Sequence, residues 1–250
     1  MSKLRAFLIH FSISATVVGA ALAVIFFAWY PTPYFEVVGA WNVVRVLIVV
    51  DLILGPLLTL ILFRSGKPGL VFDLSFIAVV QISALIFGLS TIYEERPYFV
   101  VFAVDRFEVL AKKDVETADV PAGWLAAKRW NVPLYAVASL PESLEGQQRL
   151  IDDLFAGKPD IQHRPEFWSP YTDKTAAIEK KATLLTEFAA ERPDAAEFVQ
   201  RMLDSRDDAD RLVGLPVIGK QHAFVIVLEP EHKMPIGLIP VDPWEPTPGG

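Results

Sequence analysis

A few polar side chains interrupt the apolar N-terminal part of the sequence, and they are the strongest candidates for a chemical role. They are Arg45, Asp51, Thr59, Asp73 and Gln81. An ionisable group inside a stretch long enough to cross a bilayer is costly, so it indicates either a partner within the protein or a functional site. The spacing of these residues predicts which of them can meet.

Two pairs lie at matching depth when positions are counted from the turn between the second and third apolar stretches. Asp51 lies twelve positions before the end of the second stretch, and Gln81 lies eleven after the start of the third. Thr59 and Asp73 match in the same way, four and three positions in. Equal counts mean equal depth in an antiparallel helix pair. The pattern therefore predicts that Asp51 lies beside Gln81, and Thr59 beside Asp73.

These residues allow two interpretations. In the first, the pairs hydrogen-bond the second and third helices to each other, with a stabilisation of about 0.6 kcal/mol for each bond. In the second, one of them, or Arg45 near the outer end of the second helix, faces a groove and receives a polar group from a partner's transmembrane helix. Gly55 and Pro56 predict a kink or a widened pocket after Asp51, because proline lacks an N–H and crowds the carbonyl four residues earlier.

A segment of aromatic residues at 164–171 is a candidate interface outside the apolar stretches. It contains Phe167, Trp168 and Tyr171, and the two prolines within it, Pro165 and Pro170, stiffen it. Trp and Tyr are among the side chains that most often anchor protein interfaces. If these three are exposed, we expect them to contact a partner. If they are buried, they fill the core beneath a loop.

The C-terminal part has no motif of a known catalytic or metal centre. The chain has no cysteine, and His163, His222 and His232 do not have zinc-ligand spacing. The crowded aspartates at 204–210 lack the ligand order of a calcium loop. No nucleophile elbow, dinucleotide fingerprint or Walker A motif occurs. We therefore expect no catalytic residue, cofactor or metal.

Three stretches are long and apolar enough to cross a membrane, at about 6–29, 43–63 and 70–93. The first runs on past a patch of small residues to Trp29, which favours a membrane anchor over a cleaved signal peptide. We therefore expect a transmembrane domain over residues 1–96.

The cations of this domain predict its orientation. Lys3 and Arg5 precede the first stretch, and Arg64 and Lys67 lie in the turn between the second and third. Positive charge marks the cytoplasmic side. The N-terminus is therefore expected in the cytoplasm, and everything after residue 96 on the opposite side, which in a bacterium is the periplasm.

Residues 97–242 predict one α+β domain. Runs of β-branched and aromatic residues predict strands at about 98–104, 107–111, 132–138, 213–218, 223–228 and 236–241. Helices are predicted from capping residues and apolar periodicity at about 144–155, 173–192 and 193–203. Residues 243–250 are expected to form a flexible tail. The predicted fold class is a three-helix transmembrane bundle followed by an α+β domain in which one sheet is covered by helices.

The composition limits the class of partner. Hydrophobic residues make up 52% of the chain and charged residues 21%, too apolar for disorder. Six of the 23 Lys and Arg and five of the 30 acids precede Pro97, so the remainder carries a net charge of −8. An acidic domain without a basic run argues against a nucleic-acid partner.

Several segments occur in a characteristic order. They are 51–59, 73–76 with Gln81, 96–98, 105–108 and, more loosely, 214–216. In combination they resemble the type IV pilin accessory proteins of the TfpX/TfpZ family. The resemblance implies an inner-membrane protein with a periplasmic domain that assists a type IV pilin in assembly, display or dynamics, without catalysis.

The expected partners are therefore the major type IV pilin, the lipid bilayer and the pilus assembly machinery. The three-helix part is expected to hold the apolar helix of the pilin, and the periplasmic domain to contact its globular head. The alternative function is a membrane-tethered enzyme that modifies pilin or an envelope polymer. Asp105 and Glu108 are the first catalytic candidates for that alternative, although a surface hairpin explains them more simply.

Overall fold

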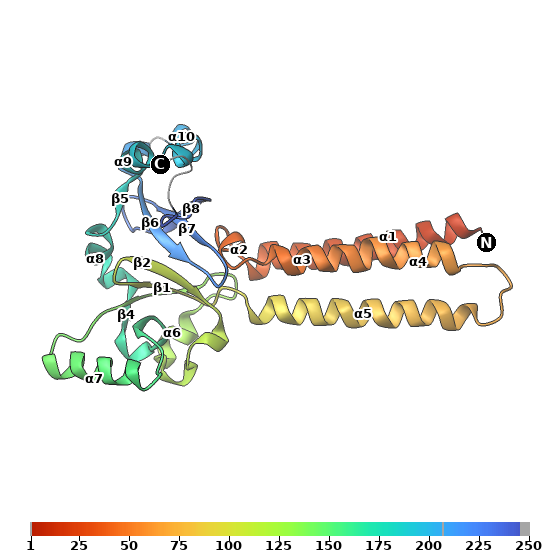
Figure 1. The fold of residues 1–250 in the computed structure, drawn as a ribbon, viewed down its shortest axis with the longest axis horizontal. Helices are drawn as coiled ribbons and strands as arrows, with labels where there is room; N and C mark the ends of the chain where they lie inside the picture. The colour runs from red at the N-terminus through yellow and green to blue at the C-terminus, as the bar shows by residue number, and fades with distance from the viewer. Residues whose placement is uncertain (1, 207, 246–250) are drawn as a thin grey trace. The chain divides into compact units, whose positions relative to one another are not determined.

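The computed structural model describes residues 2–206 and 208–245, and its fold is drawn in Figure 1. The chain forms two compact units. The helical unit consists of Met1–Trp29 and Ala40–Glu94, and the sheet unit of Tyr30–Gly39 and Glu95–Gly250. The loop between the first two apolar helices thus groups with the sheet, whereas the predicted division at 96/97 assigned it to the transmembrane part.

The helical unit contains three long apolar helices, as predicted. The first is α1 (Lys3–Val24), which continues through a π-helical turn at Ile25–Trp29. The second comprises α3 (Trp41–Ile48), a π-helical segment (Val49–Leu54) and α4 (Gly55–Leu62), and the third is α5 (Leu70–Glu94). All three are long and apolar enough to cross a membrane. Their outer faces expose large apolar side chains such as Phe27, Phe72 and Phe87, a surface suited to hydrocarbon.

The π-helical segment has a local cause in the sequence. Pro56 lies in the first turn of α4 and cannot donate a main-chain hydrogen bond to the turn before it. The main-chain hydrogen bonds there take the wider π-helical spacing instead, and Asp51 lies inside the widened turn. Single π-helical turns occur frequently at functional sites.

The sheet unit is built on one mixed sheet of eight strands in the order β4-β3-β1-β2-β6-β7-β8, with β5 also paired to β6. The strands are β1 (Phe99–Ala103), β2 (Arg106–Leu110), β3 (Leu134–Ala138), β4 (Trp168–Pro170), β5 (Thr183–Leu184), β6 (Val213–Ile218), β7 (Ala223–Leu228) and β8 (Pro235–Ile239). β1 runs parallel to β3, and β2 parallel to β6, while the other pairs are antiparallel.

Both faces of the sheet are covered, which confirms the predicted α+β class. On β1, Phe99 and Val101 pack into one buried cluster with α7, while Val100 and Phe102 pack into another on the opposite face. A third cluster joins β7 and β8 to α9 and α10. The covering helices are α6 (Ala122–Ala127), α7 (Leu144–Phe155), α8 (Thr175–Glu179), α9 (Leu185–Glu191) and α10 (Ala196–Asp204).

The helix predicted over 173–192 is divided in the structure. α8 ends at Glu179, β5 pairs with the start of β6, and α9 begins at Leu185. The apolar spacing is helical throughout, but pairing of Thr183 with Gly214 supplies main-chain partners that a continuous helix would not use. The short strand β4 and the helix α6 were also missed. Most of the predicted tail, at 246–250, lies outside the described residues.

The loop Tyr30–Gly39 supplies part of the sheet unit's core. It contains the short helix α2 (Tyr34–Val37), and Tyr34 and Val37 are fully buried in the cluster that covers β1 and β6. Gly219 lies so close to this helix that a Cβ there would meet the carbonyl oxygen of Val37 at 2.0 Å. The loop therefore packs tightly against the end of β6.

Candidate functional site

Asp51 and Gln81 meet in the middle of the helical unit, as their depth predicted. Asp51 lies on the π-helical segment and Gln81 on α5, and their exposed fractions are 5% and 9%. The Gln81 Nε2 donates to the main-chain carbonyl oxygen of Asp51 at 3.1 Å. Gln81 thus stabilises the disturbed main chain of the widened turn.

Gly55 makes room for this contact. A Cβ at this position would lie 2.0 Å from the Gln81 Nε2. The Gln81 amide consequently rests directly on the main chain of the second helix. The glycine and the glutamine form one packing unit, and any larger residue at 55 would displace the amide.

Two buried acceptor atoms at this contact have no hydrogen-bond partner within the described residues. They are the Oδ2 of Asp51 and the Oε1 of Gln81. Only the nitrogen of the Gln81 amide can donate to a carbonyl oxygen, so the unpaired atom of that amide is its oxygen. Polar atoms without partners are costly when they are buried, and more so where no water is present.

A small cavity of about 160 Å³ opens beside these acceptors. Its polar lining is His10, Ser14, Asp51 and Gln81. The rest of the lining is apolar and comes from α1 and α5: Ile13, Val17, Val18, Ala78, Ile82 and Leu85. We call this space the intramembrane pocket. Most of its lining is apolar, and Asp51 and Gln81 offer it acceptor atoms.

The other predicted pair, Thr59 with Asp73, does not form. The Thr59 Oγ1 lies 2.6 Å from the His10 Nδ1 on α1, while Asp73 makes a 2.5 Å ion pair with Lys67 in the turn. Depth counting matched Thr59 and Asp73, but it compared only the second and third helices, and α4 packs closely on α1. Arg45 is exposed and is not part of the pocket lining.

The predicted interface residues of the sheet unit belong to its core. Trp168 and Tyr171 are buried and Phe167 is half-buried. The Trp168 Nε1 donates to the carbonyl oxygen of Ile161 at 3.1 Å, and the Tyr171 hydroxyl donates to that of Lys233. The condition set for a partner contact, exposure, is not met, so the core interpretation of this segment applies.

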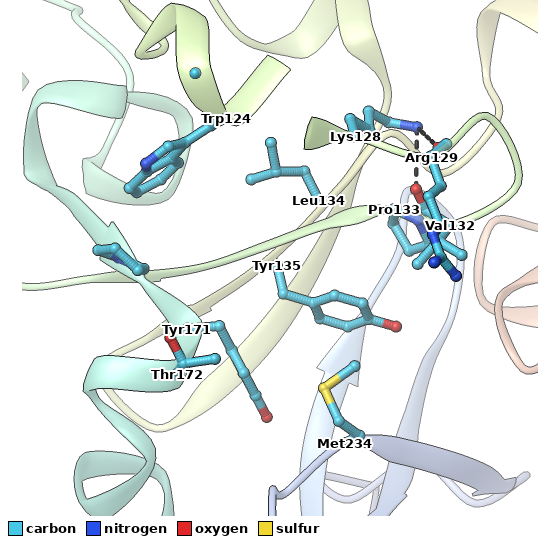
Figure 2. Close-up of a pocket in the computed structure, with 12 residues that line it drawn as sticks. Trp124, Lys128, Arg129, Val132, Pro133, Leu134, Tyr135, Tyr171, Thr172 and Met234 are labelled. Carbon is cyan, nitrogen blue, oxygen red and sulfur yellow. Dashed lines mark hydrogen bonds between the residues drawn. The ribbon is translucent and has the colours of Figure 1, made fainter. Parts of the chain in front are cut away.

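A second cavity, of about 450 Å³, lies in the sheet unit beside β3 (Figure 2). Trp124, Tyr135, Tyr171 and Met234 form its apolar wall, and Lys128 and Arg129 lie at one side. The Lys128 Nζ donates to the carbonyl oxygens of Arg129 and Val132, both at 3.0 Å, and burial lowers the pKa of this lysine. The Lys128 charge is therefore used to hold its own loop.

The residues suggested for catalysis are occupied in ion pairs. Asp105 contacts Arg106 at 2.7 Å, and that hydrogen bond lowers the pKa of Asp105. Glu108 lies 3.2 Å from the Nε2 of His163. Among the described residues, no cluster of three or more His, Asp or Glu side chains is arranged to hold a metal ion.

Comparison with known proteins identifies the family. Residues 1–39 match the model of the fimbrial assembly protein FimB. A curated fimbrial assembly protein of serogroups C1 and C2 from Dichelobacter nodosus is 38% identical over 115 residues, which cover 88% of that relative and 45% of this chain. The chain belongs to the fimbrial assembly protein family.

Two further family members from the same organism align over most of the chain. The serogroup I protein is 28% identical over 230 residues, and the serogroup E1 protein 29% over 231 residues. Each alignment covers 90% of this chain and 86% of the relative. No solved structure is significantly similar to this one.

In this member of the fimbrial assembly protein family, sequence reasoning missed the contribution of α1 to the site. His10 and Ser14 both line the intramembrane pocket, and both lie within the stretch that matches the family model. They are four positions apart, which puts them on one face of a helix. Polar residues at that spacing in the first apolar stretch were the available signal.

Proposed function

We propose that this chain is an inner-membrane accessory factor that binds a type IV pilin during pilus assembly, without catalysis. The observation that carries the proposal is the intramembrane pocket, whose lining includes two residues with unpaired acceptors, Asp51 Oδ2 and Gln81 Oε1. The names of the relatives, which are fimbrial assembly proteins, support it. So does the resemblance of the sequence to the TfpX/TfpZ pilin accessory proteins.

The proposed mechanism is shielding of a helix in the bilayer. A pilin waiting in the membrane has an apolar helix that will later pack inside a fibre. A partner with apolar outer faces and a polar notch can cover one side of that helix and fix its position. Helix association in a bilayer gains little from the hydrophobic effect, so close packing and a few polar contacts supply the specificity.

The proposed orientation follows the cations. Lys3 and Arg5 at one end, with Arg64 and Lys67 in the α4–α5 turn, lie in the cytoplasm, and the sheet unit lies in the periplasm. A phosphatase reporter fused at the C-terminus is expected to be active, because that enzyme requires export. Activity only of a reporter that needs the cytoplasm would contradict the orientation.

Site-specific photo-crosslinking in cells tests pilin binding. A photoreactive residue at Val17 or Ile82, both at the pocket, is expected to capture pilin. Val80 is the matched control, because it is one residue from Gln81 and exposed but does not line the pocket. Capture from Val80 equal to that from Ile82 would count against a defined site. Unchanged surface piliation after deletion of the gene would count against the function itself.

A further inference from the structure

We infer that the intramembrane pocket receives a hydrogen-bond donor carried by an apolar helix of the partner, and that Asp51 and Gln81 are the acceptors. The inference rests on the proposed function, because the helix is taken to be that of the membrane-resident pilin. It adds the chemistry of the contact: the partner brings a hydroxyl, amide or ammonium group, and not an ionised acid.

Contacts within the helical unit hold both acceptor residues in place. The Gln81 Nε2 donates to the Asp51 carbonyl oxygen at 3.1 Å, and the amide occupies the space that a side chain at Gly55 would fill. The Asp51 carboxyl projects from a widened turn that Pro56 imposes. Its Oδ2 and the Gln81 Oε1 remain buried and unpaired within the part of the chain that the structure describes.

The neighbouring polar groups do not satisfy them. The Nδ1 of His10, on α1, lies 2.6 Å from the Oγ1 of Thr59, on α4. Lys3, Arg45 and Lys67 do not line the pocket. Neither His10 nor Ser14, the other polar residues of the lining, bonds to the two acceptors in the part of the chain that the structure describes. The acceptors are therefore open to a donor from a partner.

The size and the rim of the pocket point to a side chain on a helix. A volume of about 160 Å³ holds a side chain, whereas a whole helix is about 10 Å across and stays outside. Ile13, Val17 and Ile82 line the pocket and yet are 59%, 43% and 57% exposed, so they give an apolar surface for the helix that carries the donor. Asp51 lies near the middle of its span, far from both ends. Bulk water is absent at that depth of a bilayer.

The test uses synthetic leucine-rich transmembrane peptides with one central guest residue. The full-length protein, in lipid discs and carrying a photoreactive residue at Val17, is offered peptides with Leu, Ser or Asn as the guest. We expect Ser and Asn peptides to be captured roughly 3-fold to 18-fold better than the Leu peptide, the range for single polar contacts between transmembrane helices. Equal capture of the three peptides by the unaltered protein would overturn the inference.

Two variants locate the effect. Asp51→Asn replaces one of the two acceptor atoms by a donor at the same size, and we expect the preference for Ser over Leu to fall, with Gln81 Oε1 keeping part of it. Asp73→Asn makes the same change near the α4–α5 turn, where Asp73 pairs with Lys67, and the preference should persist. A preference that is unchanged in Asp51→Asn would overturn the assignment of Asp51. The guest series on the unaltered protein decides the main claim even if a variant does not fold.

The outcomes also separate this inference from the proposed function. Pilin capture without guest preference leaves the function standing and removes the donor claim. Guest preference without pilin capture leaves the pocket chemistry standing and removes the pilin. Capture of a second copy of the chain in place of the peptides would overturn the choice of occupant.

Discussion

The hydroxyl oxygens of Tyr34 and Tyr135 lie 2.8 Å apart, although 101 positions separate the two residues. Tyr34 is on α2, in the loop that follows the first apolar helix, and Tyr135 is on β3. Burial raises the pKa of Tyr135 to about 12, and burial also raises that of Tyr34. Both therefore remain neutral hydroxyls at physiological pH, and their bond anchors the loop to the sheet.

Tyr135→Phe should destabilise the sheet unit. It removes one hydroxyl and leaves that of Tyr34 buried without this partner, which costs about 1–3 kcal/mol. Urea unfolding followed by tryptophan fluorescence measures the loss. The double variant Tyr34→Phe/Tyr135→Phe is expected to lose less than the sum of the two single changes, because it leaves no hydroxyl unpaired. Strict additivity would show that the two groups do not interact.

Gly55→Ala should loosen the helical unit. The added Cβ would lie 2.0 Å from the Gln81 amide, so the amide has to move and its bond to Asp51 is lost. The amide is the end of a flexible side chain and can move, so the expected cost is that of the lost hydrogen bond, about 0.6 kcal/mol. Thermal unfolding in detergent, followed by circular dichroism, measures the change. Gly19→Ala is the control, since nothing lies within 4 Å of a Cβ at 19; equal losses for both would refute the packing argument.

A double-mutant cycle distinguishes the observed partner of Thr59 from the predicted one. We expect a coupling of about 0.6 kcal/mol between Thr59→Val and His10→Ala, the average for polar contacts between membrane helices. The cycle of Thr59→Val with Asp73→Ala should give a coupling near zero. Unfolding in mixed detergent measures both couplings. The reverse pattern would support the pairing expected from depth counting.

The contribution of His163 to the stability of the sheet unit should fall as the pH rises. Its Nε2 lies 3.2 Å from Glu108, and that hydrogen bond, against some loss from burial, raises the pKa of His163 above its ordinary value. The charged form is favoured in the folded state, so the stabilisation is full below about pH 6.5 and is lost as the pH rises through the folded pKa. Its size is on the order of 1 kcal/mol.

Urea unfolding at about pH 6 and about pH 8.5 measures this difference. In His163→Gln the part of the pH dependence due to this pair should vanish, while His222→Gln, at an exposed position, should leave the dependence as it is. An identical pH dependence in His163→Gln and the unaltered protein would exclude the pair as its source.

The sequence was sufficient for the features that depend on local pattern. Apolar length predicted three membrane-crossing helices, and β-branched runs predicted β6 at 213–218 and β7 at 223–228 with the bounds observed. The helix predicted at 144–155 is α7, and the Oγ of Ser143 caps it by accepting from the Gly146 N–H at 3.1 Å. Equal depth also predicted that Asp51 and Gln81 are neighbours, and they are in contact. The prediction holds because antiparallel helices joined by a short turn have a fixed register.

Features that depend on long-range packing were not accessible in this way. Thr59 pairs with His10 because α1 packs against α4. The spacing of the second and third helices does not predict where α1 packs. The division of the helix at 173–192 follows from pairing with β6, a strand about 30 positions later. The burial of Trp168 and Tyr171 likewise reflects where β4 joins the sheet, since aromatic composition fits a core and an interface equally well.

The position of the loop Tyr30–Gly39 limits how this protein can be divided. A fragment that begins at Pro97 lacks Tyr34, Phe35 and Val37, which are buried in the sheet unit, and leaves their space empty. Recombinant production of the sheet part alone consequently calls for the loop to be grafted or the chain to be circularly permuted. Exchange of this part between related genes would need two inserted pieces, and a single crossover would leave a mismatched core.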